Sequence, residues 1–309
     1  MSILVLTLFL QTPNFDTIKP KAFEYPYKVE VFDLPQAANG VKYRLFVRPP
    51  LRKPAPESQA SSFYFFDALR NFTPAAAMSY NYEFFNYIPA AYFIGIGYTN
   101  EADGITKESN RTRDYTPTSF KPPNNQHFLA NSPQDWKGSG GAAAFFEVIQ
   151  DLIIPFIESK YNVCKTDRVL IGKSTSGLGA LYGALAKPEL FNRYLVVSPA
   201  IWWDDWLKPR HQRAVMELAD STKTQKMGRE TRIYLAVGQA EERLRLVTDL
   251  YVFADTLRQR QDKNLKIALE VLPGEQHESV FPSAFMRGIV ALYADEPNRR
   301  SSASPVTWD

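Results

Sequence analysis

Cysteine and histidine are scarce in this 309-residue chain, and both shortages limit its chemistry. The single cysteine, Cys164, excludes an internal disulfide and any zinc site built on several cysteines. Only three histidines are available as proton-transfer residues. The 36 basic and 33 acidic side chains give a net charge of +3 without a dense run of Lys or Arg, so we expect no nucleic-acid partner.

Long apolar runs are also missing, so we expect no membrane span. The stretch 3–10 (ILVLTLFL) has the length of a signal-peptide core but lacks a basic leader and a clear cleavage site. We interpret residues 1–25 as an N-terminal extension that carries a signal-peptide remnant, and we expect a periplasmic or secreted protein. A strand or a disordered tail at this end, and a cytoplasmic location, are the alternatives.

The apolar residues, 45% of the chain, follow two periodicities. Two alternating segments flank Ala38-Asn39-Gly40 and predict a hairpin, whereas the later short apolar runs suit strands buried on both faces. Segments with apolar residues at spacings of three and four predict helices between them. The predicted strands cover 29–33, 41–47, 63–66, 91–96, 168–171, 194–197, 233–237 and 267–272, and the predicted helices 145–157, 177–186, 210–220, 242–262 and 282–294.

Strands that alternate with helices indicate parallel pairing in a sheet covered on both faces. We therefore predict one α/β domain over residues 26–309, with no internal repeat. Residues 99–140 are polar and rich in Pro, Asn, Ser and Gly, which predicts a long functional loop. Residues 202–230 predict a second excursion above the sheet, in the manner of a cap.

One segment with chemical potential, Gly172-Lys-Ser-Thr-Ser176, runs directly from a predicted strand into a predicted helix. This is the setting of the G-x-S-x-G nucleophile elbow, which exposes a serine above the sheet edge, here Ser174. Ser176 stands where the second glycine is usual. A phosphate-binding loop is an alternative, but it requires glycine where Asp167 stands. The other alternative is an ordinary strand-to-helix turn with a capping serine.

A serine hydroxyl becomes a nucleophile only when a base accepts its proton, and histidine is the usual base. His277 lies between the last predicted strand and the last predicted helix, where the order serine, acid, histidine places the base. His211 lies in a polar helical stretch, which indicates a solvated position. His127 precedes the serine and is limited to contact with substrate.

The carboxylate that orients the histidine is expected after the strand 233–237. Glu241 and Glu242 both stand there, and their spacing does not choose between them. Backbone N–H groups must also stabilise the oxyanion, and one of them belongs to Thr175, the residue after the nucleophile. The other is expected from residues 67–69, which follow an early strand.

Seven segments carry a recognisable pattern: 111–117 (RTRDYTP), 140–142 (GGA), 154–161 (IPFIESKY), 172–182 (GKSTSGLGALY), 187–194 (KPELFNRY), 198–204 (SPAIWWD) and 272–277 (LPGEQH). Together they resemble the putative-esterase family of α/β hydrolases over roughly residues 26–295. The most similar branch looks like the esterases that cleave the trilactone of siderophores of the enterobactin and salmochelin type. The resemblance implies the α/β-hydrolase fold, a mostly parallel central sheet with helices on both faces.

The resemblance also implies roles for individual residues. Ser174 is the implied nucleophile, His277 the general base and Glu241 the acid. The backbone N–H of Leu69 is the implied partner of the Thr175 N–H in the oxyanion hole. The chain departs from the family pattern around the reacting serine at three positions, with Ala68 for Gly, Lys173 for His and Ser176 for Gly.

The implied activity is that of a serine esterase that works through an acyl-enzyme, without a metal or an organic cofactor. Its expected partner is a small-molecule ester, a catecholate siderophore or its ferric complex. Such a ligand is anionic and flat, so Arg111, Arg113 or Lys173 is expected to meet its charge, and Trp136 or Trp202 its rings. The alternatives are an esterase or thioesterase for another acyl group, and a non-catalytic binder with the same fold.

Overall fold

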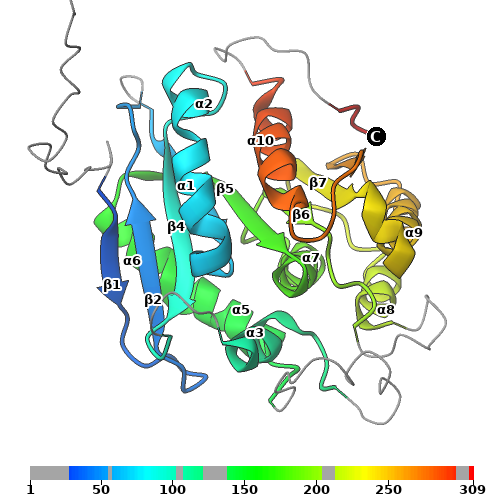
Figure 1. The fold of residues 1–309 in the computed structure, drawn as a ribbon. Helices are drawn as coiled ribbons and strands as arrows, with labels where there is room; N and C mark the ends of the chain where they lie inside the picture. The colour runs from blue at the N-terminus through cyan, green and yellow to red at the C-terminus, as the bar shows by residue number, and fades with distance from the viewer. Residues whose placement is uncertain (1–27, 55–57, 102–106, 121–137, 204–212, 297–305) are drawn as a thin grey trace, which may run out of the picture.

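Eight strands make up the sheet: β1 (Glu30–Asp33), β2 (Tyr43–Arg48), β3 (Ala60–Phe65), β4 (Ala91–Tyr98), β5 (Val163–Lys173), β6 (Arg193–Val197), β7 (Thr231–Gly238) and β8 (Leu265–Leu272). Their order is β1-β2-β4-β3-β5-β6-β7-β8 (Figure 1). β2 pairs antiparallel with β1 and β4, and the remaining neighbours are parallel. The structure is a computed structural model that describes residues 28–54, 58–101, 107–120, 138–203, 213–296 and 306–309.

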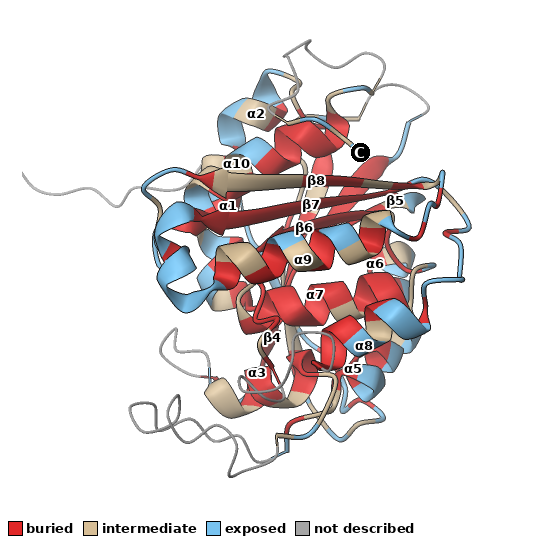
Figure 2. Cartoon of the chain, turned by 90° about the vertical axis from the view of Figure 1, so that its right-hand side faces the viewer, coloured by how far each residue is buried: buried red, intermediate tan, exposed pale blue. Residues whose placement is uncertain are grey.

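Helices cover both faces of the sheet, as Figure 2 shows. One face carries α1 (Thr73–Met78), α2 (Tyr80–Phe84) and α10 (Val280–Tyr293). The other carries α3 (Glu108–Tyr115), α5 (Ala142–Val148), α6 (Ile154–Lys160), α7 (Thr175–Ala186), α8 (Ala214–Ser221) and α9 (Leu246–Arg258). Two π-helical turns, η2 (Ala68–Phe72) and η3 (Ile149–Ile153), and a 3-10 turn, η5 (Gln239–Leu244), complete the described helices.

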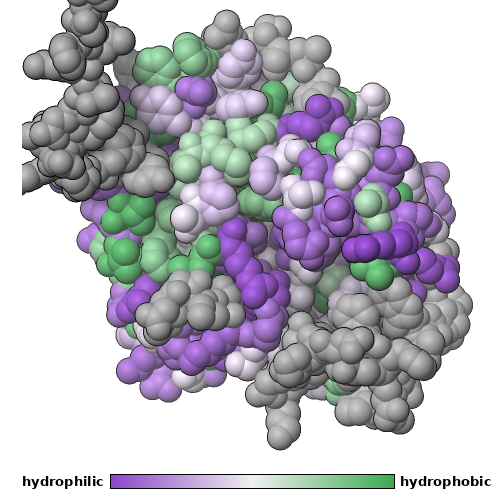
Figure 3. All heavy atoms as spheres, in the orientation of Figure 1, coloured by the Kyte–Doolittle hydropathy of each residue, from purple (hydrophilic) through white to green (hydrophobic). Residues whose placement is uncertain are grey.

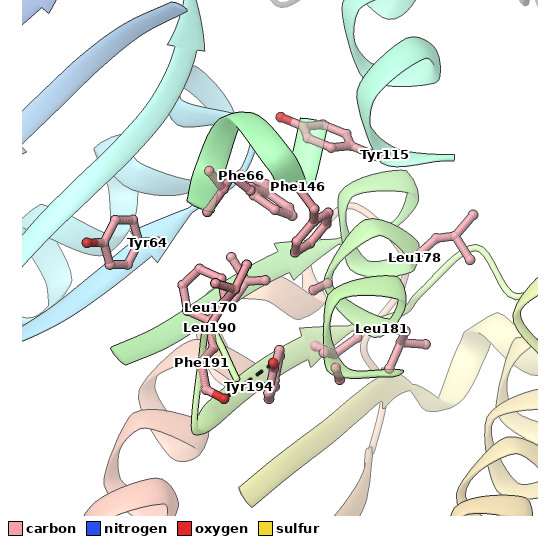
Figure 4. Packing of buried hydrophobic residues seen from close by; sticks show 14 of the residues in the cluster. Tyr64, Phe66, Tyr115, Phe146, Leu170, Leu178, Leu181, Leu190, Phe191 and Tyr194 are labelled. Atoms are coloured by element: carbon pink, nitrogen blue, oxygen red, sulfur yellow. Dashed lines mark hydrogen bonds between the residues drawn. The ribbon is translucent and has the colours of Figure 1, made fainter. Parts of the chain in front are cut away.

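The core has two layers because successive side chains of a strand point to opposite faces. In β3 every residue is buried: Phe63 and Phe65 belong to the layer under α10, whereas Tyr64 belongs to the layer under α7. Figure 4 shows part of the second layer, in which Phe66 and Phe146 pack between β5 and α7. A parallel sheet buried on both faces is what the continuous apolar runs predict.

The segment 99–140 differs from the predicted loop because it contains α3. The sequence of α3, ESNRTRDY, shows no apolar stripe, yet Arg111, Asp114 and Tyr115 are buried in it. Its charged residues are buried as ion pairs, which a hydrophobic periodicity does not reveal. The short helices η2, α1 and α2 between β3 and β4 also lie outside the predicted elements. Figure 3 shows apolar residues gathered on the surface over α1 and α2.

Several predictions fall partly or wholly outside the described residues. These are the N-terminal extension 1–25, Trp136 and His127 in 121–137, and His211 in 204–212. Within the predicted cap 202–230, α8 packs beside α7 and α9 rather than above the sheet edge (Figure 2). Among the helices that the structure describes, none is both long enough and apolar enough to cross a membrane.

Candidate active site

Ser174 occupies a sharp turn between the end of β5 and the start of α7. Its backbone has φ 60° and ψ −123°, a region that residues other than glycine rarely adopt. Three backbone hydrogen bonds fix the turn: the Ser174 N–H donates to Val197 O, and Ser174 O accepts from the N–H groups of Leu178 and Ala200, each at 3.0 Å. Such strain persists where the surroundings determine it, as in a nucleophile elbow.

The residues on either side of Ser174 explain how the elbow tolerates a serine in place of the second glycine. Ser176 turns its hydroxyl back into the elbow, where it donates to Lys173 O at 2.8 Å and accepts from Lys173 N at 3.0 Å. Gly172 has no such freedom, because a Cβ there would overlap the carbonyl oxygen of Ser176. The first small residue of the motif is therefore required, and the second is replaceable by serine.

A Gly172→Ala variant is expected to lose about 3 kcal/mol of unfolding free energy, because the methyl group has no space and the elbow must shift. Ester hydrolysis is expected to fall with it. Gly228→Ala is the matched control, since a Cβ at Gly228 meets nothing within 4 Å. Urea denaturation of both variants tests this, and equal midpoints would show that the elbow accommodates the methyl group.

His277 and Glu241 are hydrogen-bonded to each other. His277 lies in the loop after β8, and Glu241 lies in η5, directly after β7. His277 Nδ1 lies 2.6 Å from Glu241 Oε2, and the Glu241 side chain is 2% exposed. Glu241 Oε1 accepts from the Ser198 hydroxyl at 2.6 Å and from the Gly238 N–H at 2.9 Å. Burial raises the pKa of Glu241, but the hydrogen bonds from His277, Ser198 and Gly238 outweigh it, so the pKa lies below its usual range.

The structure distinguishes the roles of Glu241 and Glu242, the two carboxylates that the sequence left as alternatives. Glu242 points to α9, where its carboxylate accepts the backbone N–H of Thr248 at 2.8 Å and also the Thr248 hydroxyl. Glu241 alone of the two contacts the imidazole of His277. Glu241 is therefore placed to select the tautomer of the imidazole and to stabilise its protonated form.

Ser174 and His277 line one cavity of about 360 Å³. Ser174 is only partly buried, so its side chain is accessible from this space. Its walls are formed by residues from 67–74, α3, the elbow and 277–282. The lining residues are Asp67, Arg70, Asn71, Pro74, Arg111, Lys173, Ser174, His277, Glu278, Phe281 and Pro282.

The predicted oxyanion donors lie on two sides of this region. Thr175 is the first residue of α7, so its N–H has no acceptor within the helix. Leu69 lies in η2, between the lining residues Asp67 and Arg70, although Leu69 is not itself a lining residue. The role of both amides stays a prediction.

Of the predicted substrate-binding residues that line the cavity, Lys173 is the one whose charge is not held in an ion pair among the described residues, although the nearby charges of Glu241 and Glu278 favour its protonated form. It is half-buried, and its ammonium forms no hydrogen bond or ion pair with the residues that the structure describes. Burial is the main cause that lowers the pKa of Lys173. An anionic ligand in the cavity would add a direct partner for this ammonium.

The other predicted substrate-binding residues are placed differently. Arg111 lies on the cavity wall, but its guanidinium is bonded to Asp67 and Glu108. Arg113 is outside the cavity lining, since its guanidinium pairs with Asp114. Trp202 also lies outside it and packs against Trp203, with ring centroids 6.1 Å apart. Arg111 and Arg113 are therefore held in ion pairs within the protein, and Trp202 packs against a neighbouring ring.

Sequence reasoning missed several residues of the site. Ser198, whose hydroxyl donates to Glu241, follows β6; the sequence marked it only as the first residue of the segment 198–204, without a role in the site. Asn71, Arg70 and Phe281 come from helices that flank the cavity and carry no motif. The described residues contain no group of three or more His, Cys, Asp or Glu that could hold a metal ion.

A strained serine between a parallel strand and a helix shares a cavity with a histidine that is hydrogen-bonded to a buried glutamate, and this arrangement defines a serine hydrolase of the α/β-hydrolase fold. Comparison with protein families identifies the family. The family described as "Putative esterase" matches residues 42–291, and the chain belongs to this family.

Individual relatives and solved structures are also similar to this chain. The ferri-bacillibactin esterase BesA of Bacillus subtilis (strain 168) is 31% identical over 216 residues, which are 68% of this chain and 70% of that protein. The BES protein from Bacillus cereus superposes with a TM-score of 0.72 at 24% identity, over 90% of this chain and 98% of that one. The siderophore hydrolase EstB from Aspergillus nidulans gives a TM-score of 0.72 at 21% identity, over 92% and 100% of the two chains. At these identities the two structures establish the fold.

Proposed function

We propose that the chain hydrolyses an ester or lactone bond of a catecholate siderophore, either free or as its ferric complex. The names of its relatives support this substrate class, since one is a ferri-bacillibactin esterase and another a siderophore hydrolase. The observation that carries the proposal is a cavity lined by Ser174, His277 and Lys173, whose ammonium forms no ion pair with the residues that the structure describes. A catecholate ligand is anionic, so a cation beside the reacting atoms suits it.

Each catalytic group has a definite task in this proposal. The Ser174 hydroxyl oxygen attacks the ester carbonyl carbon while His277 accepts its proton, and Glu241 stabilises the imidazolium. The N–H groups of Thr175 and Leu69 stabilise the oxyanion. The C–O bond then breaks, the alcohol leaves with the proton from His277, and the acyl group stays on Ser174. Water attacks this acyl-enzyme by the same route and releases the acid.

A substrate panel tests the proposed class. Purified protein is incubated with ferric and iron-free trilactones of the bacillibactin and enterobactin type, their linear fragments, and neutral short-chain acyl esters and thioesters, and products are resolved by chromatography. We expect kcat/KM to be highest for a catecholate lactone. Turnover of only the neutral esters or thioesters would favour the other acyl substrates, and no turnover at all would favour a binding protein.

A Lys173→Met variant is expected to raise KM for an anionic catecholate ester by about 10- to 100-fold, since a hydrogen bond between charged groups is lost. KM for a neutral ester is expected to stay within about twofold of wild type. Because burial lowers the pKa of Lys173, the wild-type preference for the anionic ester should decline with rising pH before that of an ordinary lysine site. Steady-state kinetics on both esters across alkaline pH measures this.

The control for this variant lies on the same strand. Lys165→Met removes an exposed ammonium from β5, eight residues and roughly 26 Å from Lys173. We expect it to leave KM for both esters unchanged. An equal rise in KM for the two variants would assign the effect to the overall charge of the protein, and no rise for Lys173→Met would remove Lys173 from the substrate site.

We also propose that the protein works outside the cytoplasm, in the periplasm or as a secreted protein. The support is the apolar stretch 3–10, which has the length of a signal-peptide core. Cell fractionation with N-terminal sequencing of the recovered protein tests this, and recovery of the full-length chain from the cytoplasm would overturn it.

A further inference from the structure

Helix α3 contacts both elements that carry the predicted oxyanion donors. On the side of α7, a Cβ at Gly179 would lie only 3.0 Å from the Cβ of Tyr115, so the two helices approach closely there. On the side of β3, the rings of Phe66 and Tyr115 are stacked with centroids 5.0 Å apart. α3 thus lies between the helix that begins with Thr175 and the turn that leads to Leu69.

The turn that leads to Leu69 has an unusual conformation at Asp67. Asp67 follows β3 and has φ 53° and ψ 60°, the left-handed region that favours glycine. Two residues of α3 hold it there. The Asp67 N–H donates to the Tyr115 hydroxyl at 3.0 Å, and the Asp67 carboxylate accepts Arg111 Nε at 2.8 Å and Arg111 Nη2 at 3.0 Å. A bidentate pair of this kind fixes orientation as well as distance.

Two further ion pairs, which share Glu108, attach the middle of η2 to the same helix. Arg111 Nη1 donates to Glu108 Oε2 at 2.8 Å, and Arg70 Nη2 of η2 donates to Glu108 Oε1 at 2.7 Å. The residues Asp67, Arg111, Glu108 and Arg70 therefore form a continuous chain of opposite charges. Arg111 is 5% exposed, and three of its nitrogens donate to carboxylates, so its charge is compensated within the protein.

This attachment determines which amides of the turn remain available. The Asp67 N–H is bonded to Tyr115, and the N–H groups of Arg70 and Asn71 donate to Asp67 O at 2.9 Å. Among the described residues, the N–H groups of Ala68 and Leu69 have no acceptor. Because the direction of these amides depends on the backbone angles of Asp67, a relaxed Asp67 would turn them away from their present direction.

We infer that Arg111 and Tyr115 are positioning residues that hold Asp67 in its left-handed conformation and so aim the Leu69 amide at the oxyanion of the reacting ester. The inference rests on the proposed ester hydrolysis at Ser174. It assigns α3 a role in transition-state stabilisation. Arg111 then acts through Asp67 and does not bind the substrate.

Arg111→Lys tests the inference, because lysine keeps the charge but cannot form the bidentate pair. With a neutral short-chain ester we expect kcat to fall about 100-fold, the effect of one lost oxyanion donor, with KM within about twofold of wild type. The rate of labelling by a fluorophosphonate should fall in parallel. Arg113→Lys is the matched control: it removes a bidentate pair with Asp114 on the same helix, outside the cavity, and should leave kcat and labelling unchanged.

Tyr115→Phe is the second variant and preserves packing while it removes the acceptor of the Asp67 N–H. We expect kcat for the neutral ester to fall about 10-fold, with an unchanged near-ultraviolet circular dichroism spectrum. Unchanged kcat and labelling in both folded variants would overturn the inference. So would a rise in KM for anionic esters alone, which would make Arg111 a substrate-binding residue. Failure of the siderophore substrate proposal would appear separately, in the wild-type protein, as cleavage of neutral esters only.

Discussion

Ser174→Ala is expected to lower kcat for ester hydrolysis by a factor on the order of 10⁴ to 10⁶ and to leave the fold intact. The backbone of the elbow depends on hydrogen bonds to Val197, Leu178 and Ala200, none of which uses the Ser174 side chain. Alanine therefore removes the attacking oxygen without releasing the turn. Rate measurements on the preferred ester, with a thermal melt of both proteins, test the two halves of this expectation.

Active-site labelling makes the same prediction specific to one atom. A fluorophosphonate should form an adduct on Ser174 in the wild-type chain and none in Ser174→Ala, as judged by mass spectrometry of the peptide. Ser176→Ala is the matched control, because Ser176 binds the Lys173 backbone and should keep the label on Ser174. A folded wild-type chain that resists labelling would indicate a binding protein whose elbow no longer activates the serine.

The elements with a clear hydrophobic period could be predicted from the sequence. The hairpin of β1 and β2, the buried strands β3 to β8, and the helices α7, α9 and α10 follow directly from runs and spacings of apolar residues. The elbow could also be located, because its strand-to-helix setting is local in the sequence. Boundaries moved by a few residues, as at α9, where Arg245 in the left-handed region separates η5 from the helix.

The polar parts of the site could not be predicted, because their partners are distant in the sequence. α3 is buried through charges that are neutralised by Asp67 and Glu108, so its sequence looks like that of a solvated loop. For the same reason Arg111 resembled a free substrate-binding cation. The role of Ser198 became apparent only in the fold, where its hydroxyl lies 2.6 Å from Glu241 Oε1. Compensation of charge is a property of the folded chain, and composition does not record it.

The choice between the two adjacent glutamates yields the second large effect. Glu241→Gln is expected to lower kcat by about 10⁴-fold, because an amide cannot hold the imidazole in the required tautomer or stabilise the imidazolium. Glu242→Gln is the matched control and should keep kcat near the wild-type value, since Glu242 binds Thr248 on the outer side of the loop. Steady-state kinetics of the two variants measure the difference. Equal losses would mean that the loop, and not one carboxylate, supports His277.

The pH dependence of stability provides an independent readout for Glu241. Its pKa is lowered in the folded protein, so its ionised form contributes stability above the ordinary glutamate pKa of about 4.3, and this contribution is lost as the pH falls through the lowered value. The difference in unfolding free energy between wild type and Glu241→Gln should therefore shrink as the pH falls below about 4.3. Glu242→Gln should not reproduce this profile, because Glu242 lacks the buried hydrogen bonds from His277, Ser198 and Gly238.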